Sequence, residues 1–370
     1  MINLLEKALE LLSIFEKNGY EAYLVGGFVR DHIMGKPSAD VDICTNATPM
    51  EIKEIFKDVK LPFEGYGSVH LNYKKVVFEI TTYRIDLEYN DNRTPSKIMY
   101  TDKLLIDLKR RDFIMNTLCM DNKGNIIDLL GATTDIRQKV INSVGICEKK
   151  FKEDPLRILR AIRFATELGF SLSDDVKQAI KDNKELLGKL SFYRKKQELN
   201  RIFSSPNALV GIKIIKDYDL DKYLGINLDK NIVNTNDPLG IWAQVSPDSR
   251  YQFTSLERKY INSILKLLKD KKISDMELYY EGNYVCYIAA QILNQDEVNI
   301  YNRYDNLPIK SKSDIALKPA EIISLLSLKD KSLVKKIIND LEIKIIRRVI
   351  NNEVDVLKKY IIDTYKNNMI

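Results

Sequence analysis

The sequence predicts a mixed α/β head followed by an all-helical remainder. Two observations lead to this fold class. Short, β-rich apolar runs bounded by turn residues are confined to about the first 140 residues. Beyond Arg137, apolar residues recur with helical spacing almost to the end of the chain. With 370 residues, of which 45% are hydrophobic, the chain is long enough to bury cores in two or more domains.

The head begins with an amphipathic segment, and short strands follow it. Residues 1–22 place leucine, alanine and phenylalanine on one side, so they predict one helix that Gly19 closes. Four runs that follow are apolar or alternate with a period of two. They predict strands, the last two forming a hairpin around Lys74-Lys75. These strands are Tyr23–Val25, Val41–Cys44, Val69–Tyr73 and Val76–Tyr83.

A glycine pair follows the first predicted strand. Gly26 and Gly27 permit a sharp turn and bring bare backbone N–H groups close to a ligand, as phosphate cradles require. Arg30 follows on the first turn of a predicted helix. The turn and the arginine together predict a site for a triphosphate.

Two aspartates flank Val41 at the start of the second strand. Because side chains alternate along a strand, Asp40 and Asp42 are expected on the same face. Two adjacent carboxylates are hard oxygen ligands suited to Mg²⁺. Glu79 lies in mid-strand, where a carboxylate is unfavourable, on the face opposite Phe78 and Ile80. It is expected either to face the same cleft as a third catalytic carboxylate or to be an exposed edge charge.

Two later motifs combine arginine with acidic or amide side chains. In the first, Arg111 offers N–H donors to phosphate oxygens, and Asp112 with Asn116 could bind a ribose hydroxyl. In the second, Glu153-Asp154-Pro155 opens a helix whose arginines recur every three residues. This spacing forms one slanting stripe, while Leu159, Ile162 and Phe164 are expected to pack inward. The stripe consists of Arg157, Arg160 and Arg163.

These segments together resemble the class II tRNA nucleotidyltransferase and bacterial poly(A) polymerase superfamily. The resemblance rests on LVGGFVRDHIMGKPSADVDICTNATP, VFEITTYR, RRDFIMN and EDPLRILRAIRFA. It covers the first 205 residues strongly and the last 60 weakly. It implies a polymerase-β-like head, catalytic roles for the three carboxylates, and triphosphate binding by the arginines. It also implies that Asp154 and Arg157 read the incoming base in place of a template.

Elementary chemistry agrees with that base-reading role. Cytosine and adenine both present an exocyclic amino donor beside a ring-nitrogen acceptor, which match a carboxylate and a guanidinium. Uracil and guanine present a carbonyl and a ring N–H there, so both charged groups of the protein would be mispaired. Two unpaired buried groups predict a rejection of at least about a hundredfold to a thousandfold. The pair therefore suffices to select CTP and ATP.

Positive charge gathers at the end of the chain. Residues 301–370 hold 14 lysines and arginines against 9 acidic residues, in a chain whose net charge is +6. This region is expected either to present solvated helix faces or to bind RNA phosphates. The candidate tRNA-binding residues are Arg347, Arg348, Lys358 and Lys359.

The sequence thus predicts a CCA-adding enzyme that extends the 3′ end of tRNA with CTP and ATP, using Mg²⁺. A poly(A) polymerase, a CC-adding enzyme and an A-adding enzyme are alternatives, and a non-catalytic RNA-binding relative fits poorly with three retained carboxylates. The expected domains are a head (1–140), a neck (141–205), a body (206–300) and a tail (301–370). Absence of an apolar stretch of 18 residues and of paired cysteine spacing predicts a cytoplasmic protein with no membrane span, its oligomeric state left open.

Overall fold

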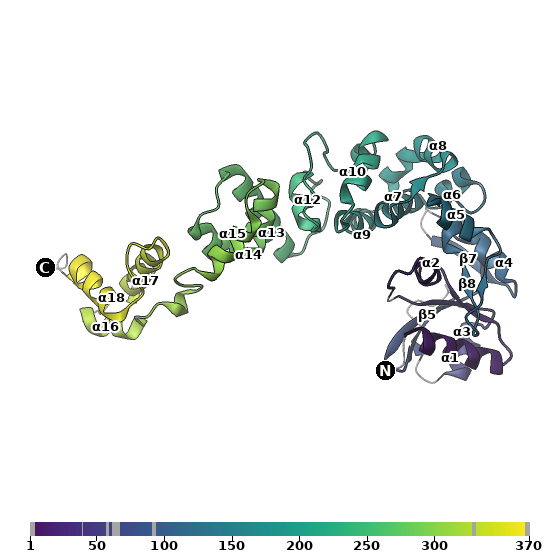
Figure 1. Ribbon diagram of the computed structural model, residues 1–370, viewed down its shortest axis with the longest axis horizontal. Coiled ribbons are helices and arrows are strands. Elements are labelled where there is room, and N and C mark those ends of the chain that lie inside the picture. The colour runs from purple at the N-terminus through teal and green to yellow at the C-terminus, as the bar shows by residue number, and fades with distance from the viewer. Residues whose placement is uncertain are drawn as a thin grey trace. The chain divides into compact units, whose positions relative to one another are not determined.

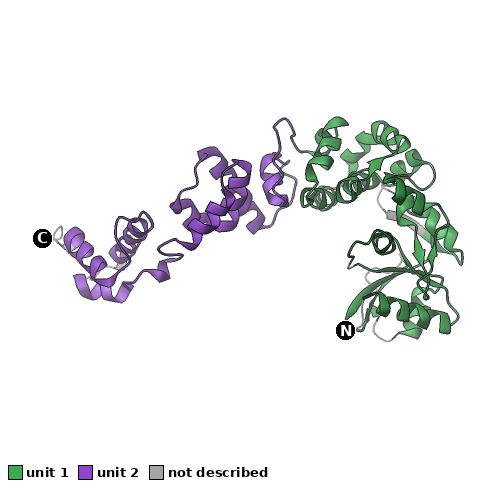
Figure 2. Cartoon of the chain, viewed as in Figure 1, with its two compact units in different colours: residues 1–225 green, residues 226–370 purple. Residues whose placement is uncertain are grey.

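The structure is a computed structural model that describes residues 4–38, 40–56, 59–60, 67–90, 94–327 and 331–366. The chain forms two compact units, residues 1–225 and residues 226–370, which Figure 2 colours separately. Each unit is described by itself below, and the four-part division expected from the sequence remains a prediction.

A mixed sheet of seven strands forms the head. Its strand order is β3-β4-β5-β2-β1-β8-β9; β2 and β5 are parallel and the other neighbours are antiparallel. The strands are β1 (Ala22–Val25), β2 (Asp42–Thr45), β3 (Val59–Lys60), β4 (Ser68–Tyr73), β5 (Val76–Thr82), β8 (Cys119–Met120) and β9 (Ile126–Ile127).

One face of this sheet packs on helices and holds the core of the head. Helices α1 (Leu4–Lys17) and α3 (Pro49–Ile55) contribute Leu12 and Ile52 to a cluster that also buries Ile43, Phe78 and Ile80. Figure 1 shows both helices on the same side of the strands. Side chains alternate along a strand, so Asp42 and Glu79 point to the opposite face.

The first helix is shorter than the sequence predicts. It ends at Lys17, and Ala22 already belongs to β1, so the expectation of a helix over residues 1–22 is wrong at its end. Gly19 adopts φ +84°, and the N–H of Tyr20 donates back to the carbonyl of Phe15. This left-handed turn stops the helix and directs the chain into the sheet.

The predicted hairpin is confirmed. Strands β4 and β5 pair from Tyr73–Val76 to Ser68–Thr81, with Lys74 and Lys75 both at positive φ in the two-residue turn. Such a turn matches the natural twist of the strands. A second hairpin, β6 (Arg84–Asn90) and β7 (Thr94–Tyr100), follows and forms its own two-stranded sheet.

The rest of the first unit is mainly helical, as the sequence predicts, but a short parallel strand pair interrupts it. Gly211 lies where helices cross: an added Cβ would be 2.4 Å from Thr166 Oγ1 and 2.6 Å from Ile202 Cγ2. These elements are α2 (Gly27–Ile33), α4 (Leu104–Arg110), a 3₁₀ turn (Ile114–Asn116), α5 (Ala132–Gln138), β10 (Val140–Ile141), α6 (Cys147–Glu153), α7 (Leu156–Leu168), β11 (Ser171–Leu172), α8 (Asp174–Asn183), a second 3₁₀ turn (Lys184–Lys189), α9 (Phe192–Phe203), α10 (Ala208–Asp217) and α11 (Asp221–Leu224).

The described part of the second unit is helical. The buried carboxylate of Glu342 accepts hydrogen bonds from the hydroxyls of Tyr279, at 2.7 Å, and Tyr280, at 3.2 Å, and so ties α17 to α14. The elements are α12 (Pro238–Gln244), α13 (Ser255–Asp270), α14 (Asp275–Ile292, broken at Gly282), α15 (Glu297–Asp305), a 3₁₀ turn (Lys312–Asp314), α16 (Pro319–Leu326), α17 (Lys331–Ile346), α18 (Val354–Ile361) and a final π turn (Ile362–Lys366).

Two expectations about the whole chain can be compared with the structure. The four cysteines are free and buried, as their spacing predicts. Among the described residues, every helix is too short or too polar to cross a bilayer.

Candidate active site

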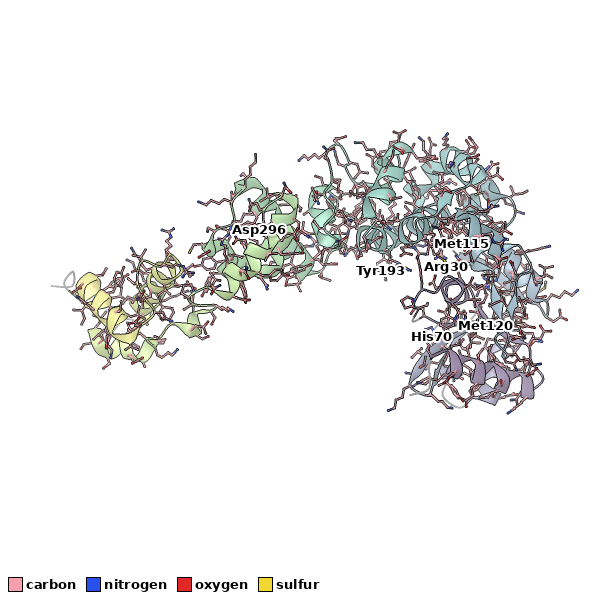
Figure 3. The ribbon with its side chains drawn as sticks, in the orientation of Figure 1. Arg30, His70, Met115, Met120, Tyr193 and Asp296 are labelled. Carbon is pink, nitrogen blue, oxygen red and sulfur yellow. The ribbon has the colours of Figure 1, made fainter. Side chains whose placement is uncertain are left out.

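A polar cleft of about 1230 Å³ lies within the first unit. Its lining brings together every residue that the sequence predicts for catalysis or nucleotide binding, from Gly26 in the head to Arg163 in the neck. Figure 3 shows the side chains of this region and labels Arg30, which belongs to helix α2. The geometry therefore unites motifs that lie more than one hundred residues apart in the sequence.

Three carboxylates form the floor of the cleft. Asp42 opens β2 and is the register partner of Glu79 on β5, while Asp40 lies two residues earlier; all three line the cleft. Of the two readings of Glu79, the structure supports the cleft-facing one. Loss of hydration, reinforced by the charges of Glu79 and Asp40, raises the pKa of Asp42 to about 6.

This donor set fits a magnesium ion that is shared with a substrate. Within the described residues, no three acidic, cysteine or histidine side chains converge closely enough to form a complete metal site. Mg²⁺ is usually held by one or two carboxylates together with waters and substrate phosphates, so two aspartates suffice. Burial and the neighbouring carboxylates raise the pKa of Asp42, and a divalent cation bound beside it would favour its charged form.

The glycine turn lies against these carboxylates. Gly26 adopts φ +79° and ψ −134°, a conformation that residues with a side chain rarely adopt, and an added Cβ would lie 3.9 Å from Asp42 Oδ2. Its N–H donates to the carbonyl of Leu118 at 3.1 Å. The N–H of Gly26 is therefore already used, contrary to the expectation that both glycines present bare N–H groups, and only its missing side chain leaves room for a ligand. Gly27 begins α2, where the first N–H groups lack helical partners.

Arg30 is held in place by three contacts. Its Nη1 donates to Asn116 Oδ1 at 2.6 Å, and its Nε donates to Asp31 Oδ1 at 2.9 Å. Its guanidinium carbon lies 5.5 Å from the ring centre of Phe164. Because Arg30 uses the amide oxygen of Asn116, the NH₂ group of Asn116 is the part that suits a ribose hydroxyl.

Phe164 is buried, as the sequence predicts together with Leu159 and Ile162, and it also lines the cleft. The guanidinium carbons of Arg160 and Arg163 lie 5.5 and 4.1 Å from its ring centre, as part of the same cluster as Arg30. The helical pattern alone missed this role, because the arginines that gather on the ring come from two helices.

A buried aspartate orients Arg111. Asp107 is fully buried and accepts from Arg111 Nη2 at 3.2 Å and from Arg110 Nε at 2.8 Å. Arg111 Nε is buried without a hydrogen-bond partner, and Nη1 faces the position of a Gly26 Cβ at 3.7 Å. Asp107 is not among the residues that the sequence predicts for the site, although an acidic residue four positions before an arginine on a helix is a recognisable signal.

Arg160 and Arg163, two arginines of the stripe on α7, form ion pairs with acidic side chains. Arg160 donates to Asp112 Oδ2, and Asp112 Oδ1 accepts from the N–H of Phe113 at 2.8 Å. Arg163, only 2% exposed, donates to Glu198 at 2.7 Å and to Glu167 at 3.1 Å. All three stripe arginines line the cleft, as the predicted spacing requires.

The predicted base-reading pair is also held by neighbours. Asp154 lies between α6 and α7; its Oδ1 accepts from the N–H of Leu156 at 3.1 Å and its Oδ2 from Arg194 Nη2 at 2.9 Å. Arg157 Nη1 donates to Glu153 at 3.0 Å and to the carbonyl of Lys150 at 3.1 Å. Arg194 on α9 thus holds Asp154 in place just before the start of α7.

The four candidate tRNA-binding residues lie in the second unit. Arg347 and Arg348 are exposed at the end of α17, and Arg348 Nη2 donates to the carbonyl of Asn306 at 2.9 Å. Lys358 and Lys359 lie in the last turn of α18. Their role in binding RNA stays a prediction.

The fold and site define a nucleotidyltransferase of the polymerase-β-like kind. Residues 22–142 match the family model of the poly A polymerase head domain. Residues 169–227 match that of an RNA- and SrmB-binding site of polymerase A, and residues 251–361 that of the second domain of tRNA nucleotidyltransferases. The predicted fold class, an α/β head followed by helices, is confirmed.

Full-length relatives identify the family. The chain is 33% identical over 385 residues to the CCA-adding enzyme of Ligilactobacillus salivarius, covering 95% of each chain. It is 33% identical over 391 residues to that of Bacillus licheniformis, covering 98% of each. The crystal structure of the Bacillus stearothermophilus CCA-adding enzyme in complex with CTP matches 100% of this chain and 99% of its own, with a TM-score of 0.82 and 26% identity. The chain belongs to the family of CCA-adding enzymes.

Proposed function

We propose that this protein adds C, C and A in that order to the 3′ end of tRNA, consuming CTP and ATP and releasing pyrophosphate. One observation carries the proposal: Asp154 and Arg157 share a cleft with the carboxylates Asp40, Asp42 and Glu79. A nucleotide whose base contacts Asp154 and Arg157 would have its phosphates within reach of the three carboxylates.

The triphosphate is assigned to the glycine turn and the arginines around it. Gly26 lies next to Asp42 and Arg111, Gly27 lies next to Arg30, and Arg160 extends the positive surface toward the neck. Phosphate oxygens prefer the planar fork of a guanidinium. Arg163 is buried between two glutamates, so we assign it chiefly the support of Phe164 and the wall behind the phosphates.

The ribose is assigned to Asn116 and the segment around Asp112. Asp112 holds Arg160 with one oxygen, and Arg30 fixes the orientation of the Asn116 amide. An amide whose oxygen is already bound presents its NH₂ group to a sugar hydroxyl in one orientation.

The base is selected by pairing on one edge. A carboxylate has about four acceptor positions, so Asp154 can accept from an exocyclic amino group in addition to Leu156 and Arg194. Glu153 and Lys150 fix the fork of Arg157, which would donate to the ring nitrogen. Since cytosine and adenine share this donor and acceptor pattern, one site serves both nucleotides.

Asp40 and Asp42 would hold Mg²⁺ together with the substrate phosphates, with Glu79 beside them. When bound, the metal would lower the pKa of the attacking hydroxyl and neutralise charge on the departing pyrophosphate. The three carboxylates define where that chemistry takes place.

The product on a defined tRNA end tests the proposal. A tRNA lacking its last three nucleotides, incubated with all four NTPs, should be extended by C, C and A and then no further. Sequencing of the product ends checks this outcome. A long run of A would make the protein a poly(A) polymerase, and termination after CC or addition of A alone would assign it to one of the enzymes that divide the reaction.

A further inference from the structure

A histidine extends the row of carboxylates across the sheet. His70 on β4 is the register partner of Glu79, and Glu79 is the register partner of Asp42. Register partners project from the same face of a sheet, and His70 also lines the cleft. Val69 and Leu71, its neighbours on β4, are buried in the core on the other face. The proposed function gives His70 no role.

The sheet order separates His70 from the phosphate site. The glycine turn follows β1, which lies on one side of β2, whereas β5 and β4 lie on the other side. In the row of strands, Asp42 thus lies between the proposed triphosphate site and His70. Figure 3 labels both Arg30, which belongs to α2, and His70, which belongs to β4.

The in-line geometry of phosphoryl transfer indicates that the RNA 3′ end lies beside His70. The attacking and leaving oxygens lie roughly in line on opposite sides of the reacting phosphorus. If pyrophosphate departs toward the glycine turn, the RNA 3′ hydroxyl must approach from the side of β5 and β4. Adjacent strands are about 4.8 Å apart, so His70 lies about 10 Å along the sheet from Asp42, a distance that one nucleotide can span.

We propose that His70 is a positioning residue that donates a hydrogen bond to the terminal phosphodiester of the RNA substrate. This inference rests on the proposed function. The floor of the cleft is otherwise acidic here, through Asp42 and Glu79, and would repel an RNA backbone. An imidazole N–H supplies a donor beyond the carboxylates, and the exposed Lys60, its register partner on β3, continues the same face with positive charge.

A purely structural His70 would behave differently. A cross-strand pair of His70 and Glu79 would stabilise the sheet, so its loss would lower the melting temperature without changing the affinity for one substrate over the other. A positioning role predicts a selective change in the KM for tRNA.

The experiment compares His70→Ala and His70→Gln with wild type on a tRNA ending in CC, which requires one A. His70→Ala should raise the KM for tRNA by at least about tenfold, as expected for one hydrogen bond to a charged group. The KM for ATP should change less than twofold. His70→Gln retains an N–H donor and should restore part of the loss. Asn72→Ala, on the same face of β4 one step further along, is the matched control and should resemble wild type.

A modified RNA locates the contact. A methylphosphonate at the last internucleotide linkage removes the charged oxygen. It should therefore raise the KM for tRNA of the wild-type enzyme, but it should raise that of His70→Ala by less than twofold. An equal penalty in both proteins, or an unchanged KM for tRNA in His70→Ala, would overturn the inference. If His70→Ala melts much earlier than wild type, the same cycle with His70→Leu, which fills more of the space and has no donor, decides. A wild type that extends no tRNA would instead overturn the proposed function itself.

Discussion

Two nitrogens of Arg160 donate to one oxygen of Asp112, at 2.6 and 2.7 Å, and so join helix α7 to the segment that follows α4. Arg160 holds the pKa of the Asp112 carboxyl below its usual value, although burial alone would raise it. The pair therefore links α7, whose start carries the proposed base-reading residues, to the head.

A double-mutant cycle measures this connection. Asp112→Asn and Arg160→Gln should show a coupling free energy of about 1–2 kcal/mol in unfolding, reduced from that of a fully buried pair because Arg160 is 34% exposed. The exposed pair Lys152–Glu148 is the control and should couple by less than about 0.5 kcal/mol. Chemical denaturation provides the free energies, and equal coupling in the two pairs would refute the fastening role.

The metal site predicts a separation between chemistry and binding. Asp42→Asn should reduce pyrophosphate release by about a hundredfold or more, because a group that stabilises charge in the transition state is removed. Binding of tRNA should persist. Turnover within tenfold of wild type at saturating Mg²⁺ would remove Asp42 from the catalytic role, and loss of tRNA binding in parallel would indicate misfolding.

The base reader predicts a change in selectivity. Arg157→Ala should reduce discrimination against UTP by at least tenfold, because no guanidinium remains to be mispaired with the N–H of uracil. The ratio of kcat/KM for CTP to that for UTP is the measurement. Lys152→Ala, an exposed change on the adjacent helix α6, should leave this ratio unchanged. A constant ratio in Arg157→Ala would mean that another residue reads the base.

The basic tail predicts a change in salt dependence. Neutralising Arg347, Arg348, Lys358 and Lys359 should weaken tRNA binding and lower the slope of log K against log salt by up to about one for each lost phosphate contact. Filter binding at several salt concentrations measures both quantities. The control neutralises four exposed lysines of the same unit and should leave the slope nearly unchanged if the tail binds the RNA: Lys259, Lys269, Lys271 and Lys272. An unchanged slope of log K against log salt in the tail variant would mean that these four residues only form a solvated helix face.

The sequence by itself determined the features that depend on local periodicity. The turn at Lys74-Lys75 separates two alternating runs, and the three-residue spacing of Arg157, Arg160 and Arg163 puts them on one side of α7. The Asp40–Asp42 pair follows from alternation along one strand. In each case neighbouring residues carry the information, because backbone geometry alone decides which side chains share a face.

Only the tertiary structure decided which distant groups meet. The parallel register of Asp42 with Glu79, the bond of Arg30 to Asn116 across 86 residues and that of Arg194 to Asp154 across 40 arise when separate elements pack. The same packing placed guanidinium groups from α2 and α7 around the buried ring of Phe164 at the edge of the cleft. Which arginine pairs with which acidic residue depends on their distance and burial in the folded protein. The periodicity of one chain segment contains neither of these quantities.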